Sequence, residues 1–279
     1  RRAFWTAYAI VVAFQLVTNA MFTGFGLVRY DGEAILGGSS PTDGPPTFVG
    51  DGRLADRPVL VVVAPGASAD EVDAVTEVLA GAGAVDAGRI RLTDRAVDPE
   101  ADSELSALVA NLPIGDGPAQ DADLGTQLGT ALGRAALLRH EDATPHLADA
   151  DRATVLTTLA DAGMIAFEPG TIRPGQVAVI VTGPTPEEST AVRIASLART
   201  LDAEGAGVVV VSGLGTGAGR DALVVLRSSG QEEVSTVDSV GTDAGLLATV
   251  LALTEQLERG RGDYGLRPDA TTAAPSLPP

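Results

Sequence analysis

Residues 58–83 read PVLVVVAPGASADEVDAVTEVLAGAG, and this stretch decides the fold. Its first six residues, Pro58–Val63, form an almost unbroken β-branched run. Such a run is typical of a strand in a parallel sheet that is buried on both faces. The residues Ala64-Pro65-Gly66-Ala67 then turn the chain, since a Pro-Gly pair marks a turn. The stretch therefore opens with a buried strand and a tight turn.

A helix and a second strand follow the turn. Ser68 and Glu71 have the spacing of a capping box, which predicts the start of a helix. Valine and leucine at helical spacing give this helix an apolar stripe, and the glycines after it end it. A second strand is predicted at residues 88–92, so residues 58–97 form one β-α-β unit.

The second half of the chain repeats this pattern. A second capping box, Thr185-Pro186-Glu187-Glu188, starts a helix between two buried-type strands. Strands are predicted at 177–182, 208–212 and 234–237, and later helices at 220–227 and 243–259. These elements predict an α/β domain over residues 58–260, with a Rossmann/flavodoxin-like, mostly parallel sheet and flanking helices. Its two β-α-β halves, 58–97 and 176–260, are separated by a helical insert.

The N-terminal segment predicts a membrane anchor. Residues 3–28 carry no charge, and at ~1.5 Å per residue they can cross a hydrocarbon core of ~30 Å. A cleaved signal peptide is the alternative, but its apolar region would be shorter. We therefore predict a transmembrane helix within residues 1–30 and a Gly/Pro-rich linker over 31–57. Two N-terminal arginines favour a cytoplasmic N-terminus, which would place the domain outside the cell membrane, in the cell envelope.

Composition excludes several classes of function. The formal net charge of −18 disfavours nucleic acid as a partner, because like charges repel the phosphate backbone. The chain has no cysteine, which excludes disulfides, thiolate metal sites and cysteine nucleophiles. Residues 261–279 hold Pro, Thr, Ala and Ser with few large apolar side chains, and this composition predicts a disordered tail.

A glycine-rich turn after the strand at 208–212 is the strongest local motif. Gly213, Gly215 and Ala218 fit the G-x-G-x-x-A form of a dinucleotide fingerprint. Asp238 follows at the end of the next predicted strand, near where a ribose-binding acid would lie. The motif falls in the last third of the chain. This position favours the interpretation that Gly213–Gly219 form a structural turn and not a nucleotide-binding site. We therefore assign no cofactor-binding residue and no cofactor, and keep a nucleotide-binding enzyme as an alternative.

Residues that could bind a metal are few. His140 and His146 are six positions apart, which is not the i, i+4 spacing of a shared helix face. Cu(I) prefers thiolate and thioether ligands, and the predicted domain offers one methionine, Met164, and no cysteine. The metal ligands therefore stay unassigned.

Catalytic motifs are also absent from the sequence. Neither a G-x-S-x-G elbow nor an H-E-x-x-H motif occurs. Ser212 follows a strand and precedes a glycine, but both histidines are remote from it in sequence. We therefore predict no catalytic residue and no enzymatic activity.

Several short motifs together resemble one known family. Residues from about 55 to 265 resemble the actinobacterial MctB-type copper transport protein family, also described as outer-membrane copper transporters. The motifs that carry the resemblance, in chain order, are Arg91–Asp94, Val97–Pro99, Asp149–Arg152, Ser235–Asp238, Ala248–Leu257 and Gly262–Gly265. The resemblance implies a membrane helix, an extracytoplasmic α/β domain and a role in limiting cellular copper. In some relatives it implies a role in cell-separation complexes. Copper would be a transported ion, not a cofactor.

The N-terminal segment departs from that family. Members usually continue the membrane helix into a coiled coil, whereas this chain has the Gly/Pro-rich linker. Residues 4–37 instead resemble a membrane segment of lycopene cyclases, carried by Phe14–Asn19, Val28–Asp31 and Ala34–Gly37. The chain is either a natural fusion or two genes joined in error, and no cyclase activity is expected.

Three functions follow from the sequence. The first is a membrane-anchored envelope protein of copper efflux or homeostasis. The second is a non-catalytic envelope scaffold or cell-separation partner, and the third is the nucleotide-binding enzyme. The expected partners are the membrane and either a second copy of the chain or another envelope protein.

Overall fold

The computed structural model describes residues 52–119, 121–185, 187–213, 221–229 and 234–275. They belong to one compact unit, Gly52–Pro279. The predicted transmembrane helix and most of the predicted linker lie outside the described residues. Within the described part of the chain, none of the helices has both the length and the apolar character that a membrane span requires.

Seven strands form one sheet in the order β3-β2-β1-β4-β5-β6-β7. Every neighbouring pair is parallel except β2 and β3, which are antiparallel. The strands are β1 (Pro58–Val63), β2 (Val85–Leu92), β3 (Ile165–Ala166), β4 (Val177–Thr182), β5 (Val208–Ser212), β6 (Ser235–Val237) and β7 (Asp263–Tyr264). The predicted α/β class with a mostly parallel sheet is therefore confirmed.

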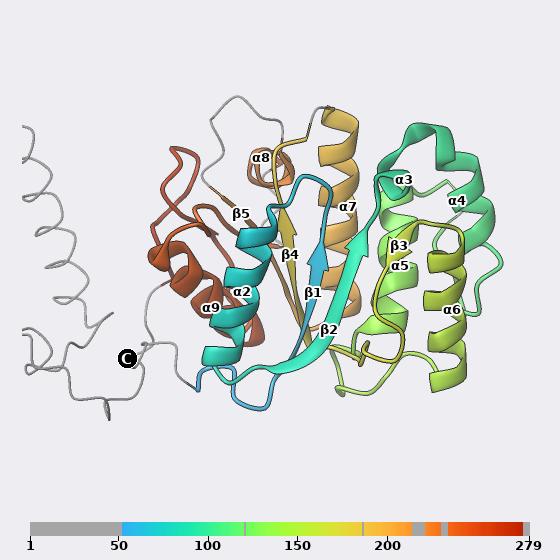
Figure 1. Ribbon diagram of the computed structural model, residues 1–279, viewed down its shortest axis with the longest axis horizontal. Coiled ribbons are helices and arrows are strands. Elements are labelled where there is room, and N and C mark those ends of the chain that lie inside the picture. The colour runs from blue at the N-terminus through green and yellow to red at the C-terminus, as the bar shows by residue number, and fades with distance from the viewer. Residues whose placement is uncertain (1–51, 120, 186, 214–220, 230–233, 276–279) are drawn as a thin grey trace, which may run out of the picture. The chain divides into compact units, whose positions relative to one another are not determined.

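Helices cover both faces of the sheet (Figure 1). Two of them, α2 and α9, pack side by side over one face, where every second residue of β1, β4 and β5 joins their apolar core. The other face is covered by α5, α7 and α8, and α4 and α6 pack against α5. The helices are α2 (Ala69–Gly81), α3 (Asp94–Val97), α4 (Asp102–Val109), α5 (Leu124–Ala136), α6 (Asp149–Asp161), α7 (Glu188–Glu204), α8 (Ala222–Ser228) and α9 (Asp243–Leu257), with a 3₁₀ turn, η2, at Pro99–Ala101.

Glycines set the distance between α5 and α7. Gly125, Gly129 and Gly133 repeat every four residues along α5 and face α7. A Cβ atom at Gly129 would lie 2.7 Å from the Cβ of Thr200, too close for any larger residue without a shift of one helix. The insert between the two sheet halves is therefore fixed to α7 by close backbone packing.

A bulge turns the side chains of β2. The register against β1 shifts between Val59 and Val61, next to Gly88, whose φ is +98°. Ala87 before the bulge and Ile90 after it both face the core under α5, α6 and α7. Beyond the bulge, Arg89 and Arg91 point to the α2 side of the sheet, since they pair with Val61 and Val63.

Several boundaries differ from the predicted ones, and three of these concern the start of the domain, the start of α7 and the start of β2. Residues 52–57 belong to the domain and not to a linker, because Leu54 is fully buried and its N–H donates to the Ala82 carbonyl. Helix α7 begins at Glu188, and the Thr185 hydroxyl donates to the Glu187 carbonyl instead of capping the helix. Strand β2 begins three residues before the predicted start, at Val85.

The C-terminal segment also differs from its prediction. Residues 261–275, expected to be disordered, form β7 beside β6, and Tyr264 bridges to Thr272. The Tyr264 side chain is buried and its hydroxyl donates to the Glu255 carboxylate. This segment is therefore part of the fold, held by contacts that its composition does not reveal.

Candidate functional site

The carboxyl edge of the sheet is the natural place to look for a site. From β1 the chain crosses to β2 through α2 on one face, and from β4 it crosses to β5 through α7 on the other face. Open α/β sheets bind ligands outside the strand ends at such a switch point. Here the two loops touch, since a Cβ atom at Gly66 would lie 2.7 Å from the Pro184 carbonyl oxygen. The crevice between β1 and β4 is therefore narrow.

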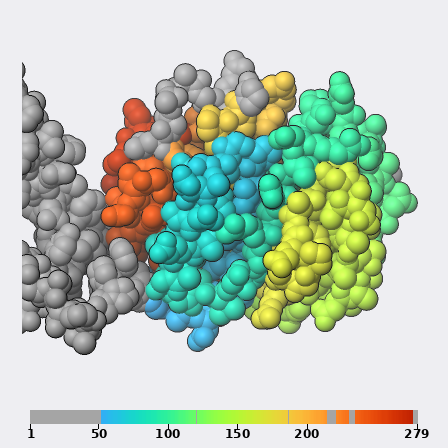
Figure 2. Space-filling view, viewed as in Figure 1, coloured from blue at the N-terminus to red at the C-terminus, as the bar shows by residue number. Residues whose placement is uncertain are grey.

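Two hollows flank this contact and share three residues, Pro65, Gly66 and Asp94. The smaller has a volume of about 300 Å³ and lies between the β1 loop, α3 and the start of α7. The larger has a volume of about 650 Å³ and lies between the β1 loop, α2 and the end of β2. In the view of Figure 2, the blue to teal surface of residues near 52–100, which supply most of the lining of the larger hollow, occupies the middle of the coloured domain.

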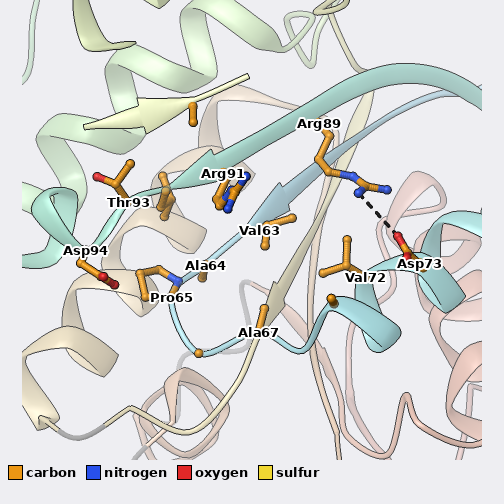
Figure 3. Close-up of a pocket in the computed structure, with 14 residues that line it drawn as sticks. Val63, Ala64, Pro65, Ala67, Val72, Asp73, Arg89, Arg91, Thr93 and Asp94 are labelled. Carbon is orange, nitrogen blue, oxygen red and sulfur yellow. Dashed lines mark ion pairs between the residues drawn. The ribbon is translucent and has the colours of Figure 1, made fainter. Parts of the chain in front are cut away.

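The larger hollow combines an apolar wall with arginines (Figure 3). Val63 and Val72 line it from β1 and α2, and Arg91 lies beside Val63. Arg89 donates to the Thr76 hydroxyl at 2.8 Å, and its Nη1 atom is 3.7 Å from the Asp73 carboxylate. Arg91 is exposed, and its side chain has no hydrogen-bond or ion-pair partner among the residues that the structure describes.

The end of the larger hollow that lies next to α3 carries a negative charge. Asp94 lies beside Pro65, at the start of α3 (Figure 3). Its side chain is exposed and has no partner within the described ranges. Thr93 also lines the hollow, but its hydroxyl donates to the carbonyls of Gly163 and Met164. The hollow is thus polarised, with an arginine near β2 and a carboxylate near α3.

The opposite end of the same edge, at β5–β7, is filled by an ion-pair network. Asp238 is fully buried, and one of its carboxylate oxygens lies 3.0 Å from Nη1 of Arg227, whose side chain is 3% exposed. The Asp238 carboxylate also accepts from the backbone N–H groups of Leu266 and Arg267. Arg227 donates further to the Tyr264 carbonyl. This network fastens the C-terminal segment to β6.

Arg267 closes the space after β5. Its guanidinium lies 2.7 Å from the Asp221 carboxylate and 3.2 Å from both the Ser212 hydroxyl and the Gly213 carbonyl. Asp221 is itself buried and caps α8 by accepting from the Val224 N–H. Ser212, considered above as a nucleophile, is thus held by an arginine.

The dinucleotide interpretation loses its ribose-binding acid here. A carboxylate that is buried, ion-paired and bonded to two backbone N–H groups has no free oxygen to offer a ribose hydroxyl. A Cβ atom at Gly265 would lie 2.1 Å from the Asp238 carboxyl carbon, so the C-terminal segment occupies that space. Gly215 and Ala218 lie outside the described residues. The environment of Asp238 therefore favours the structural interpretation.

The pKa values of two carboxylates at this edge are shifted in opposite directions, downward for Asp238 and upward for Glu71. Burial alone would raise the pKa of Asp238, but hydrogen bonds from Ser239, Arg227 and two backbone N–H groups outweigh burial and lower it. Burial raises the pKa of Glu71, and hydrogen bonds from the backbone of Ser68 and Gly213 only partly offset this. Glu71 therefore satisfies half of the predicted capping box, although Ser68 makes no side-chain cap.

The candidate metal ligands are not brought together. Met164 is fully buried in the core. The His146 ring contacts Glu204, with Nε2 2.8 Å from its carbonyl and Nδ1 3.5 Å from its carboxylate. His140 lines a separate hollow of about 230 Å³ with Asp202. Over the described ranges, no group of three or more histidine, aspartate or glutamate side chains could hold a metal ion.

The sequence did not single out the larger hollow as a site. In the sequence, Arg91 and Asp94 were noted only as the ends of a short motif that resembles the MctB family. The alternation Arg89-Ile90-Arg91-Leu92 was the available signal, since it predicts two arginines on one face of a strand. It could not show that this face remains uncovered, because this depends on where α2 packs.

The fold and this edge define an α/β domain with a doubly wound, mostly parallel sheet. Residues 46–275 match the sequence model of the family described as "Copper transport outer membrane protein, MctB". The chain therefore belongs to the MctB family.

Curated relatives agree with this assignment. A protein of Mycobacterium leprae named "Copper transporter MctB" is 30% identical over 232 residues, covering 78% of this chain and 73% of the relative. Proteins of the same name from Mycobacterium bovis and Mycobacterium tuberculosis are 29% identical over 222 residues, covering 76% of this chain and 71% of each relative. The mycobacterial sources fit the actinobacterial family that the sequence resembles.

Proposed function

We propose that this protein acts in copper transport or homeostasis at the cell envelope, with copper as its cargo. The observation that carries the proposal is the family match, which spans residues 46–275 and so includes nearly all of the described domain. The relatives are named as transporters, which supports a non-enzymatic role. The environment of Asp238 gives no support to a nucleotide-binding enzyme.

The proposed location is outside the cell membrane, with residues 1–30 as the anchor. The uncharged run at residues 3–28 supports an anchor of this kind. The family description places its members at the outer membrane, which supports the cell envelope. A protease added to intact cells whose outer layer has been permeabilised should degrade the domain, whereas a cytoplasmic marker should survive.

Cell copper content tests the function. A strain that lacks the gene, grown in copper-supplemented medium, should accumulate more copper per cell than the parent strain, as measured by mass spectrometry. The wild-type gene should restore the parental copper content, and zinc and iron should not change. Equal copper in the deletion and parent strains would contradict the proposed function.

A second complementation tests which residues handle the metal. The variant His140→Ala, His146→Ala, Met164→Leu removes the three candidate side chains, and Met164→Leu conserves core volume. Since the structure does not bring these residues together, the variant should restore copper content as well as the wild type does. A failure to complement, with normal protein abundance, would show that one of them handles copper.

A further inference from the structure

We propose that the larger hollow at the end of β1 and β2 binds a small organic carboxylate, with Arg91 as its anchor. The proposal goes beyond the copper role and does not rest on it. The hollow has a volume of about 650 Å³, within the range of about 300–1,000 Å³ that is typical of small-molecule sites. Both its position, at the carboxyl edge beside the switch point, and its volume suit a small ligand.

Arg91 differs from the other arginines of this edge. Arg227 and Arg267 are fully engaged with carboxylates and carbonyls, and Arg193 donates to the Asp102 carboxylate at 2.7 Å. The Arg91 guanidinium has no such partner in the described part of the chain, and it lies in the hollow (Figure 3). A guanidinium offers two parallel N–H groups that match the two oxygens of a carboxylate. Among the arginines that the structure describes at this edge, Arg91 is therefore the one whose guanidinium stays available to an anion.

The fold keeps the space in front of Arg91 open. In Figure 1, β2 lies between α2 and the region of β3 and α6 with no described helix in front of it. The residue paired with Arg91 on β3 is Ala166, whose small side chain also lines the hollow. The bulge at Gly88 turns Arg91 to this uncovered side. These three features together produce an arginine in an open hollow.

Charge and polarity limit the ligand class. Val63, Ala64 and Val72 give the hollow an apolar wall that can cover the hydrocarbon body of a ligand. Asp94 at the far end would repel a second negative charge, and Asp73 already balances Arg89. The ligand should therefore carry one carboxylate, at the end that meets Arg91, and an apolar or cationic group at the other end.

Ligand-observed saturation-transfer NMR with hexanoate as the probe tests the site on the full 279-residue chain. Hexanoate should bind, and hexan-1-ol, with the same apolar body and no charge, should bind at least about tenfold more weakly, as expected for the loss of charge-assisted hydrogen bonds. Arg91→Gln should weaken hexanoate binding by a similar factor. Ala166→Trp, at an exposed position in the hollow, should abolish binding by filling the space.

The matched control is Arg173→Gln, the same change at an exposed arginine that lines neither this hollow nor the smaller one beside it. It should leave hexanoate binding unchanged, and thermal melting should show that all variants are folded. Equal binding by wild type and Arg91→Gln, or by hexanoate and hexan-1-ol, would overturn the proposal. Displacement of hexanoate by equimolar inorganic phosphate would overturn the carboxylate class, because it would show an inorganic oxyanion site.

Discussion

The two ends of the carboxyl edge contain the same types of residue in opposite states. At β5–β7, Asp238 and the side chain of Arg227 are buried, the side chain of Arg267 is mostly buried, and all three make ion pairs or hydrogen bonds. At β1–β2, Arg91 and Asp94 are exposed and lack partners among the described residues. The difference teaches that an arginine or aspartate at a strand end holds the fold when a segment returns to cover it. Such a side chain is free to bind a ligand when no segment covers it and supplies polar partners.

A returning segment causes the difference. Residues 263–272 pass over β6, and their backbone N–H groups and arginine side chain use the polar atoms of that end. The segment that returns to the end of β2 is β3, whose Ala166 pairs with Arg91, and within the described ranges it gives no polar partner to the side chains of Arg91 and Asp94. Substitutions at the two ends should therefore have very different effects on stability.

The largest effect is expected from truncation after Gly260. It removes β7 and Arg267, and with them the two backbone N–H groups that bond the buried Asp238 and the Tyr264 carbonyl that bonds Arg227. A cost of about 5 kcal/mol or more is expected, enough to remove most of the stability of a typical domain. Urea denaturation followed by circular dichroism measures it. A truncated chain as stable as the full chain would show that the segment is not part of the fold.

Asp238→Asn should be the most costly single substitution of these. It removes a buried negative charge and leaves Arg227 facing a neutral amide, at a cost of about 3–5 kcal/mol. The control is Asp73→Asn at the open end, where the partner Arg89 is exposed and 3.7 Å away, and the expected change is below about 0.5 kcal/mol. Similar losses in both variants, in the same denaturation experiment, would erase the distinction between the two ends.

The stability of the protein should also depend on pH through the ion-pair network around Asp238. The pKa of Asp238 is lower in the folded chain than in the unfolded chain, so its contribution is present above the unfolded pKa. That contribution is lost as the pH falls through the unfolded value, near 3.8, towards the lower folded value. The difference in unfolding free energy between wild type and Asp238→Asn should therefore shrink on acidification. A constant difference from pH 7 to pH 2.5 would contradict this.

A smaller change in stability is expected when one arginine from each end is replaced. Arg267→Gln loses the ion pair with the buried Asp221 and should cost about 1–3 kcal/mol. Arg91→Gln has no partner to lose and should change stability by less than about 0.5 kcal/mol. Thermal unfolding of the two variants under one set of conditions gives the comparison. A cost for Arg91→Gln equal to that of Arg267→Gln would mean that Arg91 is a structural residue.

Glu71→Gln should have the smallest effect and the opposite sign. The pKa of Glu71 is raised in the folded chain, so its contribution is present below the unfolded pKa and lost as the pH rises through the folded one. A neutral glutamine can still accept from the backbone of Ser68 and Gly213. The variant should thus gain stability over wild type between pH 4 and pH 7. A variant less stable at pH 7 would show that the carboxylate charge is needed there.

The sequence alone was sufficient to predict the central strands of the sheet. Pro58–Val63, Val177–Thr182 and Val208–Ser212 appear within the predicted bounds, because long β-branched runs buried on both faces are a strong local signal. The two-residue strands β3 and β7 escaped prediction, since two residues are too short for any periodicity.

The candidate site could not be predicted from the sequence in the same way. The order of the C-terminal segment depends on Asp238 and Arg227, about 30 residues earlier in the chain, whereas its composition alone indicates disorder. Arg91 is visible in the sequence, but its direction depends on the bulge at Gly88, and its exposure depends on the packing of α2.

Hydrogen exchange of the full chain, followed by mass spectrometry, tests most directly the central claim that one end of the edge is closed and the other open. Peptides covering residues 234–240 and 262–272 should exchange slowly and together, as one cooperative unit. Peptides covering the loop at 64–68, beside the larger hollow, should exchange much faster. Complete exchange of residues 262–272 within seconds would contradict the claim, because it would show that nothing holds this segment on the sheet.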